Sequence, residues 1–257
     1  MTERQPDLPG LYDLVTIEKT DSAVAQAQRL ARKGADEGTV VWAKAQQEGI
    51  GRKGNYWMSG SRNLHCALVL RPEYDFASCC QISLLTCVCT AMAIARQAEP
   101  LEEIRFRWPN DVLLNRGKVA GITLSGELDA RGRPGWMVVG VNVNVHEYPS
   151  SRGFSAASMR DEGFQDPDRV ALLEAYTREF LSWINRWAEE GLAPVRKAWL
   201  TKSPDAGEAA TLRLGDLMIS GKYRQLDQSG ALEIIDESSR VRTITLEQFF
   251  RQDFVSP

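Results

Sequence analysis

The chain has 257 residues, of which 43% are hydrophobic, and carries 31 basic and 34 acidic side chains for a net charge of −3. This length suits one large domain, alone or with a small appendage. The charge balance gives no basic surface for nucleic acid, and the N-terminal run MTERQPDLPG lacks the apolar core of a signal peptide. The longest apolar run, 82–95, is shorter than the roughly 20 residues of a membrane span. We therefore expect a cytoplasmic protein that binds neither nucleic acid nor membrane.

Hydrophobic periodicity and turn residues predict strands and helices in mixed order along the first 145 residues. Strands are predicted over 11–18, 39–45, 63–70, 104–108, 112–114, 118–127 and 136–145, and helices over 22–33 and 76–98. Asp21 is a suitable N-cap for the first helix, and Gly34 is suited to end it. The second helix is apolar on most sides, which predicts burial.

The second half of the chain changes character near residue 205. A loop over 146–166 precedes helices predicted over 168–189 and 192–200, and short strands follow over 210–214, 217–226, 231–235 and 241–246. A polar stretch, KSPDAGEAA, separates the helices from these strands. The sequence therefore predicts a large domain over 1–205 and a small β domain over 206–257, which at about 50 residues is near the lower limit of an independent fold.

All five cysteines lie between residues 66 and 89, at Cys66, Cys79, Cys80, Cys87 and Cys89. None forms a C-x-x-C pair, and an odd number cannot pair completely within one chain. Four of them fall in an apolar helical pattern, where cysteine behaves as a small hydrophobic residue. We expect buried free thiols and, with two histidines in the chain, no histidine-based metal site.

A glycine-rich run, WAKAQQEGIGRKGNYW, occupies residues 42–57. Its three glycines are Gly49, Gly51 and Gly54, and two cations, Arg52 and Lys53, stand among them. Glycines let backbone N–H groups approach a ligand closely, and cations beside them favour an anion. A polar surface loop between two strands has the same composition, so the run alone leaves both interpretations open.

Three further runs follow the loop: RWPNDVLL at 107–114, KVAGI at 118–122 and GVNVN at 140–144. In this order they resemble the biotin protein ligases, whose corresponding motifs are GRGRRGRxW, KWPNDV, K(V/I)AGI and GINVN. The resemblance covers most of residues 12–200. It implies an α/β (α+β) catalytic domain of the biotin/lipoate ligase type, built on a mixed sheet. The run GDLMISGKYRQLDQSGALEIID at 215–236 is similar to the small SH3-like β-barrel that closes many of these enzymes.

The resemblance implies a two-step reaction that uses ATP and Mg²⁺. The carboxylate of biotin attacks the α-phosphorus of ATP, and the acyl-adenylate then passes its acyl group to a lysine in the biotin carboxyl carrier domain of a carboxylase. Two alternatives stay open, namely a ligase or transferase for lipoate or octanoate, and a non-catalytic descendant that binds an acyl or nucleotide ligand. The chain leaves no room for an N-terminal winged helix, so we expect no repressor role. A homodimer is a possible assembly.

The resemblance also implies roles for single residues. Lys118 and Arg52 correspond to catalytic residues, because cations must stand where the carboxylate meets the phosphate. Asn110 and Asp111 correspond to a pair at the nucleotide, and a carboxylate at position 111 suits Mg²⁺. The implied substrate-binding residues are Thr20, Asp21, Gln46, Gly49, Ile50, Gly51, Trp57, Gly121 and Asn142, and the implied nucleotide-binding residues are Lys53, Arg107, Asn110 and Asp111.

The chain departs from the family pattern in two places. Ile50 and Asn55 stand where the family's loop has arginine, and Lys19-Thr20-Asp21 replaces Ser-Thr-Asn. An ionised Asp21 accepts hydrogen bonds but cannot donate one as asparagine does. These departures bear on the acyl substrate more than on the nucleotide.

Overall fold

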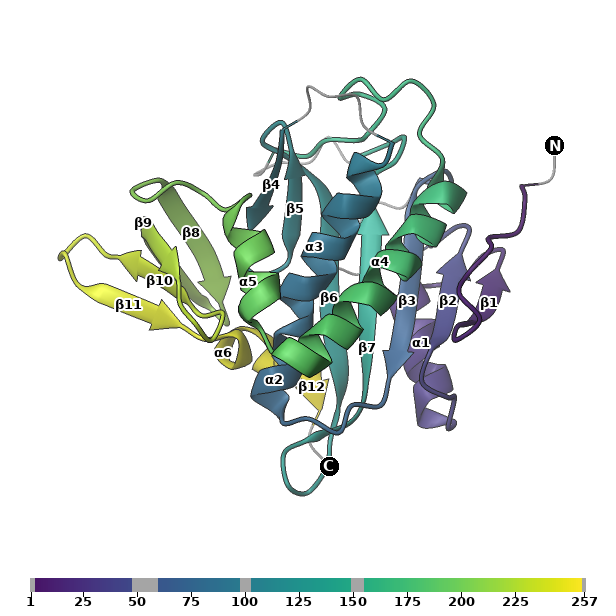
Figure 1. Ribbon diagram of the computed structural model, residues 1–257, viewed down its shortest axis with the longest axis horizontal. Coiled ribbons are helices and arrows are strands. Elements are labelled where there is room, and N and C mark those ends of the chain that lie inside the picture. The colour runs from purple at the N-terminus through teal and green to yellow at the C-terminus, as the bar shows by residue number, and fades with distance from the viewer. Residues whose placement is uncertain (1–2, 48–59, 98–102, 149–154, 256–257) are drawn as a thin grey trace.

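The computed structural model describes residues 3–47, 60–97, 103–148 and 155–255, and its centre is a mixed eight-stranded sheet (Figure 1). Seven strands follow the order β1-β2-β3-β7-β6-β5-β4, and β12 pairs with β6. Their bounds are β1 Asp13–Ile17, β2 Thr39–Ala43, β3 Leu64–Leu70, β4 Ile104–Arg107, β5 Asp111–Leu114, β6 Gly117–Leu128, β7 Pro134–Val143 and β12 Phe254–Val255. β1 runs parallel to β2, and each later neighbour along this path is antiparallel.

Helices cover the two faces of this sheet unequally. α1 (Ala23–Arg32) packs on one face, whereas α3 (Ile82–Ala95) and α4 (Arg169–Glu190) cross the other (Figure 1). α2 (Phe76–Cys80) and α5 (Ala193–Leu200) extend the second layer. In the part of the chain that the structure describes, the face that carries α1 is therefore only partly covered by helix, and its remainder is open for a site.

The close approach of α1 depends on small residues. Ala23, Ala27 and Ala31 recur every four residues on one side of the helix, and all are buried. Beneath them, a Cβ on Gly140 of β7 would come within 2.3 Å of Val24 and 2.4 Å of Thr123. Because a Cβ there would clash with both, glycine at position 140 lets α1 lie flat on the sheet.

Two predicted helix features are wrong in detail. The helix expected over 76–98 divides at Gln81 into α2 and α3. The N-cap of α1 is Ser22 rather than Asp21, and it makes no capping bond through its side chain. The reason is that the Asp21 carboxylate is bonded to Thr20 and Arg29, while Gln46 accepts the N–H of Ala23. A side chain from the segment after β2 therefore takes over the capping role.

The C-terminal strands form a separate four-stranded antiparallel sheet in the order β11-β10-β9-β8. Its bounds are β8 Ala209–Leu214, β9 Leu217–Leu226, β10 Leu232–Ile235 and β11 Val241–Ile244. Position 246, predicted as strand, instead begins α6 (Leu246–Phe250), because Thr245 and Gln248 form a capping box there. The Trp108 indole donates to Gly230 O at 2.9 Å, which joins this sheet to the RWPND segment. A domain boundary between residues 205 and 206 stays a prediction.

The main core lies between the large sheet and α3–α4, and it includes all five cysteines. All five thiols are free and buried, as expected, and burial raises the pKa of Cys66 to about 12. By length and composition the segment Phe76–Ala95 is the one candidate membrane span among the described residues, but 78% of it is buried inside the fold. This segment is the core helix layer of the domain.

Candidate active site

One row of residues crosses five strands on the face of the sheet that α1 leaves open. Cross-strand pairing sets Arg107 of β4 opposite Asp111 of β5, Asp111 opposite Gly121 of β6, and Gly121 opposite Asn142 of β7. Asn142 in turn lies opposite His65 of β3. Residues directly opposite one another in a sheet point to the same face. Four motif residues, together with His65, thus share one continuous row, which we call the site row: Arg107, Asp111, Gly121, Asn142 and His65.

A β-bulge brings Lys118 to the site row. Val112 pairs with Ala120 but Leu113 pairs with Lys118, so Val119 is an extra residue on β6. Val119 and Ala120 both point into the core, and the alternation of side chains is therefore shifted by one at this point. Lys118 consequently points to the same face as Gly121, where its Nζ lies 2.6 Å from Asp111 Oδ1. Without the bulge, the lysine would point into the apolar core.

Two asparagines hold the backbone around this pair. Asn110 Nδ2 donates to Ile122 O at 2.7 Å, and its own carbonyl accepts the Ile122 N–H at 2.8 Å. Asn144 Nδ2 donates to Ala157 O at 3.0 Å and to Lys118 O at 3.3 Å. These bonds fix β5, β6 and the segment after residue 155 against one another, so the Lys118–Asp111 pair rests on rigid elements.

Gln46 joins the start of α1 to the site row. Its Oε1 accepts the Ala23 N–H at 2.7 Å, and its Nε2 donates to Asn142 Oδ1 at 3.2 Å. His65 Nδ1 lies 2.8 Å from the same Asn142 oxygen. Gln46, Asn142 and His65 are all buried. The three side chains therefore form one buried hydrogen-bonded chain beneath the open face.

Thr20 and Asp21 lie beside Gln46, and Thr20 and Gln46 form an isolated parallel β-bridge. The Thr20 hydroxyl donates to Asp21 Oδ1 at 2.7 Å, and Arg29 binds both carboxylate oxygens at 2.8 Å. The Arg29 hydrogen bonds, followed by those from Thr20 and the Ser22 N–H, hold the pKa of Asp21 well below its usual range. Arg29 thus neutralises the negative charge that distinguishes Asp21 from the asparagine of the family pattern.

Comparisons with known proteins identify the family of this chain. The model of the biotin/lipoate A/B protein ligase family matches residues 8–201. The chain belongs to this family. It is 31% identical over 239 residues, 91% of this chain and 99% of the relative, to a biotin–[acetyl-CoA-carboxylase] ligase of Paracoccus denitrificans. It is also 29% identical over 202 residues, 76% of this chain and 61% of the relative, to the bifunctional ligase/repressor BirA of Escherichia coli.

A solved structure gives the same fold. The biotin protein ligase of Aquifex aeolicus in complex with biotin and ATP superimposes with a TM-score of 0.76, at 24% identity, and the match covers 91% of this chain and 95% of that one. At this identity the likeness supports the fold rather than the substrate. It agrees with the mixed sheet and the second small antiparallel sheet expected for a biotin/lipoate ligase.

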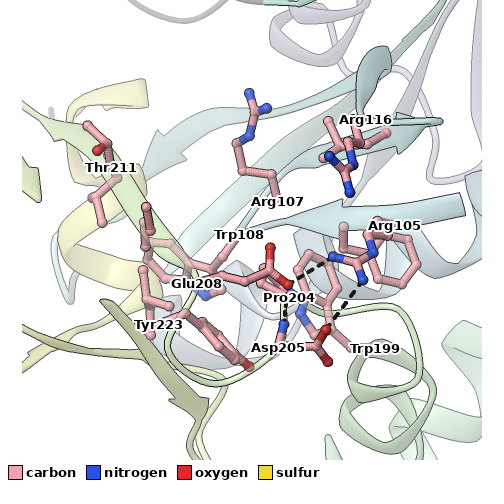
Figure 2. Close-up of a pocket in the computed structure, with 16 residues that line it drawn as sticks. Arg105, Arg107, Trp108, Arg116, Trp199, Pro204, Asp205, Glu208, Thr211 and Tyr223 are labelled. Atoms are coloured by element: carbon pink, nitrogen blue, oxygen red, sulfur yellow. Dashed lines mark hydrogen bonds and ion pairs between the residues drawn. The ribbon is translucent and has the colours of Figure 1, made fainter. Parts of the chain in front are cut away.

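Arg107 belongs to the site row but also borders a second space. Its guanidinium lies 3.7 Å from Asp111 Oδ2, and its side chain lines a cavity of about 580 Å³ between β4–β5 and the C-terminal sheet (Figure 2). Arg105, on the same strand, also lines this cavity, where it is bound by Glu208 at 2.9 Å and lies 3.5 Å from Asp205 (Figure 2). Arg107 therefore lies at the boundary between the site row and this cavity.

The structure brings together every described residue that the biotin/lipoate ligase motifs implied. Those residues are Thr20, Asp21, Gln46, Arg107, Asn110, Asp111, Lys118, Gly121 and Asn142. The other implied residues, Gly49, Ile50, Gly51, Arg52, Lys53 and Trp57, lie outside the described residues, as does Asn55. Their roles stay predictions.

Sequence reasoning missed four polar residues that support the site: Asn63, His65, Asn144 and Arg169. Asn63 and His65 flank the first residue of β3, and both are fully buried. A buried asparagine and histidine at the start of an apolar strand are an unusual pattern that could have drawn attention to them. Asn144 stands within the GVNVN motif itself. Arg169 has no comparable signal, because arginine in the first turn of a helix is unremarkable.

The Asp21–Arg29 pair predicts a small, pH-dependent effect on stability. Because the folded-state pKa of Asp21 is lowered from 3.8, the pair stabilises the fold above about pH 4 and loses this effect as the pH falls through the depressed value. The side chains are 39% and 46% exposed, so the contribution is at most about 1 kcal/mol. Urea unfolding of Arg29→Ala should show a deficit of that size at pH 7 that narrows below pH 4. A deficit that is constant across this range would contradict the assignment.

Proposed function

We propose that the chain is an ATP-dependent biotin–protein ligase, which activates biotin as its acyl-adenylate and transfers it to a lysine of a carrier protein. The observation that carries this proposal is the site row, in which Arg107, Asp111, Gly121 and Asn142 meet Lys118 on one open face. The family match over residues 8–201 and the names of the relatives support it.

The first step joins two anions, so its main requirement is positive charge at the meeting point. An oxygen of the biotin carboxylate bonds to the α-phosphorus of ATP while the bond to pyrophosphate breaks. Lys118, held at 2.6 Å by Asp111, places its ammonium group where negative charge develops on the phosphoryl and acyl oxygens. A cation fixed in advance stabilises that charge with little reorganisation. Arg52 and Lys53 of the glycine-rich run, whose roles stay predictions, would add further positive charge.

The proposed ligand head lies near the start of α1. Thr20, Gln46 and Asn142 line this region, and Arg29 neutralises Asp21 there. The sequence departure at position 21 therefore does not place an uncompensated charge beside the acyl substrate. This observation favours biotin over the alternatives of lipoate or octanoate, because the polar groups need a polar partner. The alternative of a non-catalytic descendant that binds an acyl or nucleotide ligand is disfavoured by Lys118, which is retained and lies beside Asp111.

The residues at this site fit a magnesium ion that binds together with the phosphates of the nucleotide. Among the described residues no group of three or more histidine, cysteine or acidic side chains is placed to hold a metal, so the protein offers the single carboxylate of Asp111. Mg²⁺ is commonly bound by one or two carboxylates together with substrate phosphates and waters. When bound, the ion would neutralise charge on the phosphates, and Asp111 would hold it while also orienting Lys118.

Replacement of Asp111 by asparagine should therefore change the magnesium dependence of the reaction. Asparagine keeps the size of the side chain but removes its charge. This change weakens both the binding of a cation and the contact to Lys118. The Mg²⁺ concentration for half-maximal pyrophosphate release should rise by about tenfold or more. Asp129→Asn, in the exposed turn before β7, is the control. An unchanged magnesium curve for Asp111→Asn would exclude Asp111 as a metal ligand.

The proposed function itself is tested by a screen of pyrophosphate release with Mg-ATP over biotin, lipoate and medium-chain acids. Release that depends on biotin alone supports the proposal. Release with lipoate or octanoate would favour the second alternative, and binding of an acid without release would favour the non-catalytic one. Transfer is then followed by mass spectrometry of a biotin carboxyl carrier domain as the proposed acceptor.

The remaining proposals concern the carrier protein, the cellular location and the oligomeric state. The carrier is a domain of acetyl-CoA carboxylase, which is the target in the names of the Paracoccus and Mycobacterium tuberculosis relatives. We place the protein in the cytoplasm, where ATP and the carrier are found, and expect no binding to nucleic acid or membrane at its net charge of −3. A homodimer remains part of the proposal, and its test is the mass in solution.

A further inference from the structure

The buried chain of hydrogen bonds beneath the site has a direction that its partners impose. It runs from the Ala23 N–H through Gln46 and Asn142 to His65, with donor–acceptor distances of 2.7, 3.2 and 2.8 Å. Amide side chains can be turned in either sense, so the direction must come from a group whose role is fixed.

That group is the backbone N–H of Ala23, which can only donate. Gln46 must therefore turn its oxygen toward Ala23 and its Nε2 toward Asn142. Asn142 must then present Oδ1 to Gln46, and this same oxygen lies 2.8 Å from His65 Nδ1. Since one oxygen receives both contacts, His65 donates from Nδ1.

His65 can satisfy this requirement as a neutral ring. Its side chain is fully buried, and burial, aided by the charge of Arg169, lowers the pKa of His65 below its ordinary value. Its single ring proton then lies on Nδ1. The Nε2 side lies 3.3 Å from Gly60 O.

We propose that His65 is a positioning residue that orients the Asn142 amide toward the acyl ligand, an inference that rests on the proposed function. With Asn142 Oδ1 occupied twice, its Nδ2 has no acceptor in the part of the chain that the structure describes and is available as a donor on the site row. The Thr20 hydroxyl, whose proton goes to Asp21, offers only lone pairs. Together they present one donor and one acceptor.

This pairing selects a chemical class of ligand head. A cyclic urea or amide carries a carbonyl that accepts and an adjacent N–H that donates, so it can satisfy both groups. A dithiolane ring or an alkyl chain has neither, and would leave both protein groups without partners. Unpaired polar groups in a site are a strong basis for rejecting an analogue. His65 therefore contributes to the discrimination of biotin from lipoate and octanoate without contacting the bound acid itself.

The test compares three variants by calorimetry. His65→Leu removes the donor, His65→Asn restores one near the position of Nδ1, and Gln28→Leu is a matched control. Gln28 makes a 2.8 Å bond to Ser125 between α1 and β6, so its loss also removes one polar contact between helix and sheet. We expect His65→Leu to weaken biotin binding about tenfold, with ATP binding at saturating biotin changed less than twofold. His65→Asn should recover biotin affinity to within about threefold.

The outcomes separate this inference from the proposed function. If the unmodified protein binds no biotin, the proposed function fails and the inference falls with it. If the unmodified protein binds biotin and His65→Leu binds it equally well, the function stands and the positioning role is overturned. Equal loss of biotin and ATP binding in His65→Leu, with a lowered melting temperature and no recovery in His65→Asn, would show a purely structural role and also overturn it.

Discussion

Lys118→Ala should lower the rate of biotin-dependent pyrophosphate release by about 10²–10³-fold and leave the fold intact. The reason is that Lys118 reaches the site only because of the bulge at Val119, and its Nζ is held 2.6 Å from Asp111 Oδ1. Removal of one preorganised group that stabilises developing charge typically costs a factor of this size. The side chain points away from the apolar core that Val119 and Ala120 enter, so its truncation leaves the core packing in place. Single-turnover pyrophosphate release and a thermal melt of the same variant provide the two measurements.

Lys44→Ala is a suitable control for this prediction. The Lys44 side chain is 19% exposed and its Nζ lies 2.7 Å from Glu18, so the exposure of the lysine itself is close to that of Lys118, although its partner Glu18 is far more exposed than Asp111. Lys44 points, however, to the opposite face of the sheet, where its Nζ lies 5.8 Å from the Trp42 ring. Lys44→Ala should therefore release pyrophosphate at close to the unmodified rate. Near-normal release by Lys118→Ala would remove Lys118 from the mechanism, and equal losses in both variants would point to a general effect of charge.

Periodic apolar patterns and turn residues were sufficient to predict most elements of this fold. The β5–β6 connection illustrates why, because Asn115 and Arg116, between the strands predicted over 112–114 and 118–127, adopt positive φ values of 46° and 73° in a tight turn. The β12 pairing with β6 could not be predicted, since two residues carry no periodicity. The break at Gln81 was missed for the opposite reason, because the apolar pattern continues through it.

The site shows the same division between local and long-range information. The motifs identified Lys118, Asp111 and Asn142, but their meeting in one row depends on strand register, which is a property of the whole sheet. The error at Asp21 has a similar cause. Local sequence makes aspartate before a helix a good N-cap, whereas the contact from Gln46, 23 residues away along the chain, takes over that role. His65 was missed because its importance lies entirely in its partners.

Asn63 is the other buried residue whose role lies in its partners, and it connects two segments that border the site. It is fully buried. Its Oδ1 accepts the backbone N–H groups of Val145, His146 and Glu147 at 2.9, 3.0 and 3.2 Å, and its Nδ2 donates to Glu147 O at 2.8 Å. One side chain thus holds the segment that leaves β7 just after the GVNVN motif.

Arg169 fixes the other side of Asn63. Its Nη1 donates to Lys44 O at 2.9 Å and reaches Asn63 O at 3.3 Å, and Glu3 receives its remaining N–H groups at 2.6 Å. The backbone of Asn63 is therefore tied to the end of β2, while its side chain is tied to the segment after β7. Loss of the side chain would release this second segment without disturbing the first.

Asn63→Ala should accordingly destabilise the protein by roughly 2–4 kcal/mol. Each buried backbone N–H that is left without a partner costs about 1–3 kcal/mol. Three such N–H groups lose their acceptor, and water can reach some of the three. For a protein of this size the melting temperature should fall by roughly 5–15 °C. Asn63→Asp, which keeps the acceptor oxygens and loses the donor to Glu147 O, should lose less. Asn185→Ala, at an exposed position of α4, should melt as the unmodified protein does. A melting temperature for Asn63→Ala within 2 °C of the unmodified value, measured by calorimetry at pH 7, would mean that the backbone at 145–147 satisfies its hydrogen bonds without this side chain.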